Sequence, residues 1–144
     1  MTDGWVLRIG RTGDIPTCLA LRRRVFIEEQ SVPEADEVDG RDGEAVHLLA
    51  TADGLAVGCA RLLAMGETGK IGRVCVLPDW RGRGIGAAIV RAAVGDFADR
   101  GGIAQVKLGA QLHAIGFYEA LGFTAEGPEY LDAGIAHRDM CKRL

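Results

Sequence analysis

The chain has 144 residues, of which 48% are hydrophobic and 26% charged, as in an ordinary globular protein. This length favours one domain over residues 1–144. No apolar run is long enough to span a membrane, and the N-terminus lacks the basic segment and apolar core of a secretory signal, so we expect a cytoplasmic protein without membrane contact. A net charge of −3 argues against a broad basic face for nucleic acid.

Four cysteines are scattered along the chain, at Cys18, Cys59, Cys75 and Cys141. No two of them have the close spacing of a zinc site or of a redox CxxC pair. They predict reduced, mostly buried thiols, and we expect no metal.

The first half of the chain predicts a strand, a helix and a hairpin. The strand covers residues 5–11, and a helix starts at Asp14, with Pro16 in its first turn, and runs to about Gln30. Apolar runs at 46–51 and 55–63 are separated by an Asp-Gly pair, which is typical of a two-strand hairpin. Within the helix, the run from Arg22 to Arg24 is expected on its solvent side.

Residues 31–44 are too polar and too rich in turn residues for a buried element, and they predict an acidic loop. Two interpretations stay open for the acids between Glu34 and Glu44. They form either a rim that attracts a cationic amine or an ordinary solvated loop.

The second half alternates strands and helices. A valine-rich strand is expected at 71–77, then an amphipathic helix that Gly101 and Gly102 end, and a further strand at 103–108. A short helix at 113–121 and two strands near 123–130 and 135–142 complete the order. This order predicts a mixed sheet with helices on both faces.

The most informative segment is KIGRVCVLPDWRGRGIGA, residues 70–87, which predicts a buried strand, a turn, a glycine-rich loop and a helix start. A helix N-terminus carries unpaired N–H groups and about half a positive charge, so it attracts phosphate. The glycines let the backbone approach the anion closely, and the arginines add charged donors. The predicted phosphate site comprises Arg81, Gly82, Arg83, Gly84, Ile85, Gly86 and Ala87.

The ligand of this loop has more than one candidate. Gly82, Gly84 and Ala87 also fit the relaxed dinucleotide fingerprint. A dinucleotide site normally has an acidic residue about 20 positions further on, and residues 101–110 contain none. No Gly-Lys-Ser/Thr follows either, which argues against a Walker A loop.

The pattern Arg81-x-x-Gly84-x-Gly86, after the strand Val74-Cys75-Val76, resembles the acetyl-CoA signature of the GNAT superfamily of N-acetyltransferases. The resemblance extends through FYEALGF at residues 117–123. Several shorter blocks are similar to the ElaA-like subgroup: Val25-Phe26, Glu29-Gln30, Pro33, His47 to Ala50, Ala110-Gln111, Gly134-Ile135 and His137.

This resemblance implies an α+β fold with a mostly antiparallel sheet of six to seven strands. It also implies direct transfer of an acetyl group from acetyl-CoA to an amine of a small molecule or peptide. The resemblance implies no metal, and it implies a chain that can form a homodimer. The pantetheine arm would lie along Val74, Cys75 and Val76, whose neighbourhood would supply a backbone N–H for the oxyanion. Phe117 and Gln111 would contact the coenzyme, although many members have Asn in place of Gln111.

Two further roles follow from the same chemistry. Tyr118 occupies the tyrosine position of the family's FY motif and would protonate the departing thiolate. Glu29, His47 and His137 are the candidates for the base or for acceptor contacts, whereas His113 is expected to be exposed. The alternative hypothesis is a GNAT-like module that binds acyl-CoA without transferring the acyl group.

Overall fold

The computed structural model describes residues 4–144. Seven strands form one sheet in the order β1-β2-β3-β4-β5-β7-β6. Their bounds are β1 Leu7–Thr12, β2 Val46–Ala52, β3 Leu55–Met65, β4 Thr68–Val76, β5 Gln105–Gln111, β6 Thr124–Asp132 and β7 Ile135–Arg143. The α+β class and the number of strands predicted from the sequence are confirmed.

Helical segments connect the strands. The longer ones are α1 (Ile15–Arg22), the π-helical stretch η1 (Arg23–Glu29) that continues it, and α3 (Ile85–Arg100). The short ones are α2 (Glu34–Glu37), η2 (Asp42–Glu44), η3 (Pro78–Trp80), η4 (Leu112–Ala114) and α4 (Ile115–Ala120).

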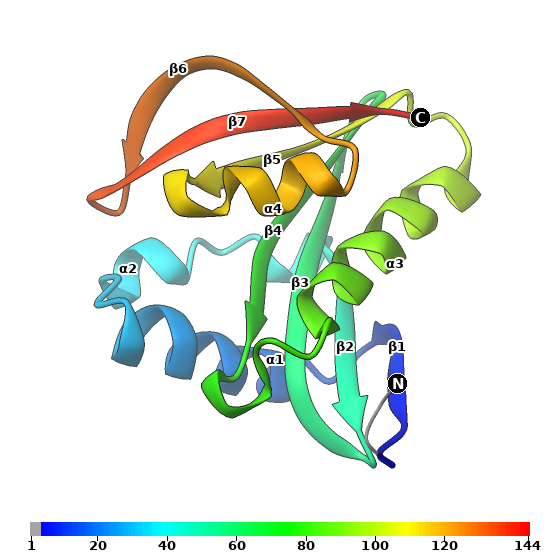
Figure 1. The fold of residues 1–144 in the computed structure, drawn as a ribbon, viewed down its shortest axis with the longest axis vertical. Helices are drawn as coiled ribbons and strands as arrows, with labels where there is room; N and C mark the ends of the chain where they lie inside the picture. Colours follow the sequence, from blue (N-terminus) through cyan, green and yellow to red (C-terminus); the bar gives the residue numbers. More distant parts are fainter. Residues whose placement is uncertain (1–3) are drawn as a thin grey trace.

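All neighbouring strands are antiparallel except β4 and β5, which pair in parallel. Figure 1 shows that β1 to β4 run roughly along the long axis of the molecule, whereas β5, β7 and β6 run across it. The sheet therefore consists of two halves that meet only where β4 pairs with β5.

The two faces of the sheet carry different helices. Buried side chains of α3, among them Ile89 and Phe97, pack against apolar residues of the strands. On the opposite face, Cys18 and Leu21 of α1 cluster with Cys59 of β3 and Cys75 of β4. The predicted arrangement of helices on both faces is confirmed.

The first helix differs from the single helix predicted from the sequence. It begins as expected, with the Asp14 carboxylate accepting a hydrogen bond from Thr17 N at 3.2 Å. After Arg22 it widens into η1, where Gln30 N donates to Val25 O, five residues back, at 3.1 Å. Such π-helical turns are rare and are frequent at functional sites. The following segment, predicted as a loop, contains α2 and η2.

Candidate functional site

Strands β4 and β5 are paired over a short distance only. Thr68, Gly69 and Lys70 of β4 align with residues 105–107 of β5, and the pairing then stops. From Ile71 to Val76, the side of β4 that faces β5 has no partner strand among the described residues. Unpaired strand edges offer N–H and C=O groups to an extended ligand.

A β-bulge interrupts β4 opposite β3. Cys75 pairs with Cys59, but the next pair is Gly72 with Arg61, so β4 has one residue more than β3 in this interval. Arg73 has a φ of 53°, an uncommon value for a residue other than glycine. The extra residue sets which side chains face which helices: Val74 and Val76 pack toward α3, whereas Cys75 packs toward α1.

The register also fixes where the backbone groups of β4 point. Leu77 N donates to Val57 O of β3 at 2.8 Å. Because N–H groups alternate between the two sides of a strand, those of Val74 and Val76 point toward the open edge. The carbonyl of Val76 already accepts a hydrogen bond from Arg81 Nε at 3.0 Å.

The glycine-rich loop leads from this edge into α3. Gly84 occupies the N-cap position with a φ of 82° and provides no side-chain cap. The first bond within the helix runs from Ala88 N to Gly84 O at 3.1 Å, so the N–H groups of Ile85, Gly86 and Ala87 precede the helical ladder. The space beside Gly84 is open. This geometry suits an anion.

The two arginines of the loop do not extend freely into solvent. Arg81 forms two hydrogen bonds with the Glu29 carboxylate, at 2.6 and 2.7 Å, and Arg83 lies over the ring of Trp80, 4.9 Å from its centroid. Arg81 therefore links the loop to the end of η1. The prediction that both arginines add donors to the phosphate did not anticipate these contacts.

The carboxylate of Glu29 is the partner of Arg81 in this ion pair. The hydrogen bonds from Arg81 lower the pKa of Glu29. Glu29 is not among the residues that line the cleft between the two halves of the sheet. Its geometry therefore favours a structural link over the role of a base.

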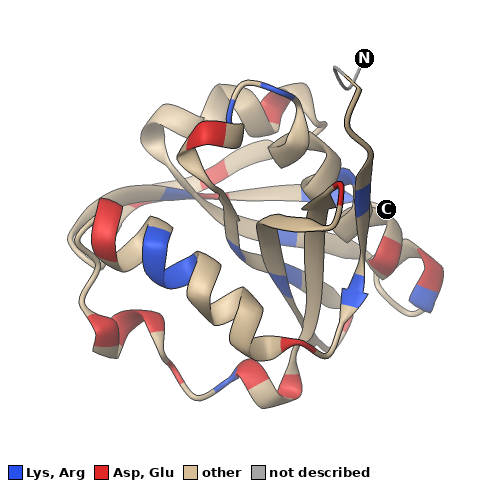
Figure 2. Cartoon of the chain, turned by 90° about the horizontal axis from the view of Figure 1, so that it is seen from below, with Lys and Arg blue, Asp and Glu red and all other residues tan. Residues whose placement is uncertain are grey.

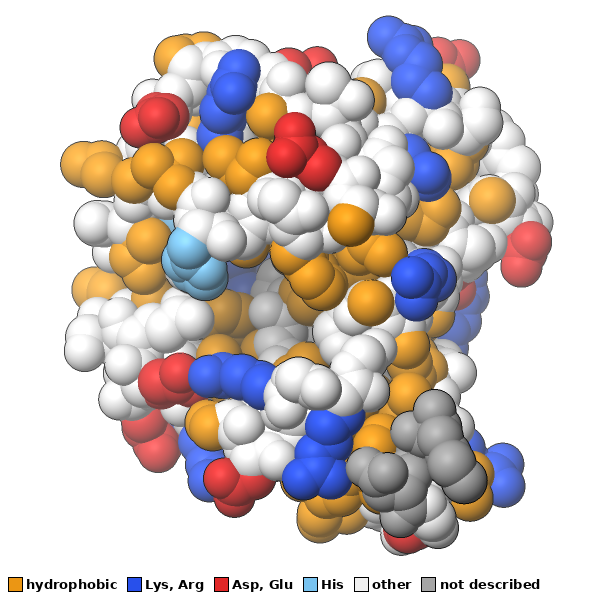
Figure 3. Space-filling model, in the orientation of Figure 1, with side chains coloured by type: hydrophobic (Ala, Val, Ile, Leu, Met, Phe, Trp, Pro, Cys, Tyr) orange, Lys and Arg blue, Asp and Glu red, His pale blue; other side chains and the backbone are white. Residues whose placement is uncertain are grey.

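A cleft of about 510 Å³ lies between the two halves of the sheet, and Figure 3 shows the hollow. Val74 and Tyr118 both line it. Burial raises the pKa of Tyr118 to about 12, so its hydroxyl stays protonated at neutral pH. Phe117 is 41% exposed. Its ring borders the loop, because a Cβ added to Gly86 would lie 3.6 Å from Phe117 Cζ.

Of the histidines proposed from sequence, only His137 lines the cleft. Its Nδ1 lies 2.7 Å from Ile135 O, and since a carbonyl only accepts, Nδ1 carries the proton and leaves Nε2 basic in the neutral ring. His47 is buried, with its Nε2 2.9 Å from Asp42 O, and it does not line the cleft.

Gln111, the last residue of β5, and His113 of the following η4 also line the cleft. Gln111 donates a hydrogen bond from Nε2 to Gln30 Oε1 at 3.0 Å, and its Oε1 lies 2.8 Å from His113 Nε2. Gln111 therefore connects β5 with the end of η1 across the cleft. His113 is exposed, as predicted, but it also lines the cleft. The position of His113 shortly after the end of a predicted strand was the sequence feature that could have indicated a cleft residue.

A network of three arginines and three acids holds the acidic loop against the sheet. Its arginines come from α1, β3 and β4 and its acids from the loop: Arg22, Arg61, Arg73, Glu37, Asp39 and Asp42. Figure 2 shows the acidic segments of α2 and η2 along the edge beside the basic stretch of the first helix. These three acids are neutralised, so they do not form a free acidic rim.

The network corrects the prediction for Arg22, which is 1% exposed and contacts Glu37 and Asp42. Arg61 donates two hydrogen bonds to Asp39, at 2.7 and 2.8 Å. These hydrogen bonds hold the pKa of Asp39 well below its usual range.

All four cysteines are free thiols, and three of them are buried. Cys75 and Cys59 place their sulfur atoms 3.5 Å apart. Within residues 4–144, no group of three or more His, Cys, Asp or Glu side chains is arranged to hold a metal ion. In the same part of the chain, no helix has the length and apolar character needed to cross a membrane.

An uncapped helix N-terminus beside an open strand edge, above a cleft with a half-buried phenol, is the arrangement of a transferase that uses a phosphate-bearing coenzyme. The family model described as an acetyltransferase (GNAT) domain matches residues 15–144, so the chain belongs to that family. Members of this class transfer an acetyl group from acetyl-CoA to an amine. The family and activity predicted from the sequence are confirmed.

Similar proteins agree with this assignment. A Bacillus subtilis protein named as a candidate acetyltransferase is 38% identical over 141 residues, covering 96% of this chain and 95% of that protein. An acyl-CoA N-acyltransferase from Pseudomonas aeruginosa has 31% identity and a TM-score of 0.83, covering 96% of this chain and 99% of that one. ElaA of Escherichia coli has 28% identity, with the same TM-score and coverage.

Replacement of Asp39 by Asn tests the network. We expect Asp39→Asn to lower the free energy of unfolding by about 2 kcal/mol at pH 7, because Arg61 loses its charged acceptor in a buried position. Since the pKa of Asp39 is depressed in the folded state, its contribution is present above about pH 4 and is lost as the pH falls below that value.

Urea unfolding at pH 7 and at pH 3 measures this difference. The matched control is Asp99→Asn on the exposed side of α3, for which we expect no change. Equal stability of the two variants at pH 7 would contradict the structural role of Asp39.

Proposed function

We propose that the cleft binds acetyl-CoA and an amine together and transfers the acetyl group directly between them. The observation that carries this proposal is the uncapped N-terminus of α3 next to the open edge of β4. The pyrophosphate would accept hydrogen bonds from the N–H groups of Ile85, Gly86 and Ala87, and the pantetheine arm would pair with Val74 and Val76.

The chemistry assigns roles to residues that line the cleft. The amine nitrogen attacks the thioester carbon, and whichever N–H group of Val74 or Val76 lies beside the thioester, unpaired with the arm, stabilises the oxyanion. His137 Nε2 accepts the proton of the amine, directly or through a water molecule. The carbon–sulfur bond breaks and Tyr118 gives its proton to the thiolate, so the products are an acetamide and free CoA. The raised pKa of Tyr118 supports this role, because a general acid must be protonated.

The setting of the enzyme is part of the proposal. Residues 1–144 act as one transferase domain, which is supported by the continuous sheet and by the family match over residues 15–144. Four free thiols support a reducing compartment, the cytoplasm. A homodimer is supported by β6, an edge strand whose outer side is unpaired in the described chain.

Replacement of Gly84 by valine tests the phosphate loop. We expect CoA at about a hundredfold excess over its Kd to raise the Tm of the native protein by roughly 5 to 10 °C. Gly84→Val should abolish this rise, because a branched residue at a φ of 82° is strained and blocks the backbone from the anion.

The control is Gly66→Val in the turn between β3 and β4, which has a φ of 61° and open space but lies outside the loop. It should lose stability and keep the response to CoA. A persistent response in Gly84→Val would mean that CoA binds elsewhere, and a response to NADH instead of CoA would favour a dinucleotide enzyme.

Replacement of Tyr118 by phenylalanine distinguishes an enzyme from a module that only binds acyl-CoA. With an amine found by screening for thiol release from acetyl-CoA, Tyr118→Phe should lower kcat at least about tenfold and leave the Kd for CoA unchanged. Phe117→Leu, at the neighbouring position beside the loop, should weaken CoA binding instead. Unchanged kcat in Tyr118→Phe would contradict the role of the phenol as acid.

A further inference from the structure

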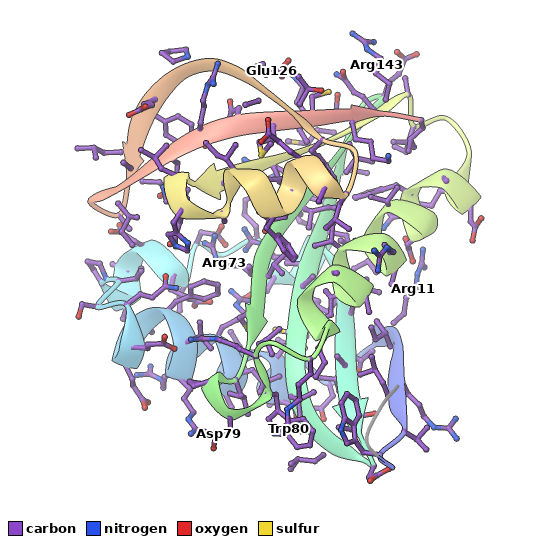
Figure 4. The ribbon with its side chains drawn as sticks, in the orientation of Figure 1. Arg11, Arg73, Asp79, Trp80, Glu126 and Arg143 are labelled. Carbon is purple, nitrogen blue, oxygen red and sulfur yellow. The ribbon has the colours of Figure 1, made fainter. Side chains whose placement is uncertain are left out.

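The acceptor half of the cleft is bounded by the face of β4 that is turned toward α1 and α2. Arg73 in the bulge and Lys70 before it both line the cleft. Figure 4 shows Arg73 between β4 and the segment that contains α2. The inference below rests on the proposed function, because it concerns the amine that this half would receive.

Most charged groups that line this half already have partners. Arg61 is bound to Asp39, Arg41 to Glu44 at 2.8 Å, and Glu37 to the buried Arg22. These pairs neutralise one another, so they hold the loop in place and offer little charge to a ligand.

Arg73 has donors to spare. Its Nη2 donates to three oxygens: Asp36 O at 3.3 Å, Glu37 O at 3.1 Å and Asp39 Oδ2 at 3.4 Å. Within residues 4–144, no hydrogen bond is formed by Nη1 or by Nε, and Nε is buried. The guanidinium is therefore held by the hydrogen bonds of Nη2 and by the ion pairs with Glu37 and Asp39, while Nη1 of this cleft-lining residue has no partner among the described residues.

Charges of both signs surround Arg73: Glu37 and Asp39 are its ion-pair partners, and Arg61 and Arg22 add positive charge. Burial lowers the pKa of Arg73, and the neighbouring charge of Arg61 lowers it further. Lys70 is exposed and has no ion-pair partner in the described part of the chain. The acids without such a partner, Asp36 and Asp132, are exposed residues of α2 and of the end of β6.

We propose that the amine acceptor carries an anionic group, a carboxylate or a phosphate, and that Arg73 and Lys70 bind this group while the amine faces the open edge of β4. A fixed guanidinium suits such a group, because charge-assisted hydrogen bonds to a preorganised donor are strong and directional. The acceptor class is therefore a small amino acid or an amino phosphate, in keeping with a cleft of about 510 Å³.

Product-like ligands test this inference without knowledge of the natural acceptor. The protein is saturated with CoA, so that the loop before α3 is occupied, and is titrated with N-acetylglycine, with N-acetyl-phosphoethanolamine and with neutral N-acetylglycinamide. Calorimetry or NMR shifts give the three Kd values. We expect an anionic ligand to bind at least about tenfold more tightly than the neutral one, and the better of the two anions identifies the group.

Two variants assign the effect to the proposed residues. Arg73→Gln and Lys70→Gln should each reduce the preference for the anionic over the neutral ligand, and the double variant should abolish it. Lys107→Gln is the matched control, because Lys107 of β5 is aligned with Lys70 but pairs with Glu126 at 3.2 Å. A purely structural role of Arg73 would weaken all three ligands equally. Lys70 is exposed and outside the network, so Lys70→Gln should fold even if Arg73→Gln does not.

The possible results separate this inference from the proposed function. Equal affinity for anionic and neutral ligands, or no binding of either anion up to its solubility limit, would overturn the inference while CoA binding remained intact. A preference that survives in the double variant would overturn the assignment to Arg73 and Lys70. Failure of CoA itself to bind would instead contradict the proposed function.

Discussion

The site depends on one constraint, the short parallel pairing between β4 and β5. Only three residues of each strand pair, and the two halves of the sheet then diverge. Divergence leaves the N–H groups of Val74 and Val76 without a strand partner and opens the cleft that Tyr118 and His137 line. Because α3 begins shortly after β4, the same edge leads directly to the anion-binding helix terminus. Coenzyme and acceptor can therefore meet from opposite faces of one sheet.

The bulge in β4 connects this edge to the acidic loop. Arg73 occupies the extra position, and its guanidinium is held by carbonyls of α2 and by Asp39, which Arg61 in turn holds. The charges of the loop are thus used to fix backbone geometry and are not free to attract a cation. A buried ion-pair network contributes little net stability but fixes one arrangement of the groups it joins, which is what a site with a defined oxyanion position needs.

Much of the fold could be predicted, because hydrophobic periodicity and glycine positions depend on local sequence. The loop before α3 and the helix start fall in this class, whereas Tyr118 was singled out only by the resemblance to the family's FY motif. The roles of Glu29 and Arg22 could not be predicted, since their partners lie 52 and 15 residues away and only the fold brings them together. The ion pairs of Arg61 and Arg73 could have been predicted. A charge inside an apolar strand requires an acidic partner, and the loop at 34–44 supplies several.

Amide hydrogen exchange at β4 tests the central claim most directly. We predict that the N–H groups of Val74 and Val76 exchange rapidly in the free protein and become strongly protected when CoA binds. Those of Cys75 and Leu77, which point toward β3, should be protected in both states and serve as internal controls. Protection of Val74 and Val76 in the free protein, or the absence of any change on CoA binding, would contradict the claim that this open edge receives the coenzyme.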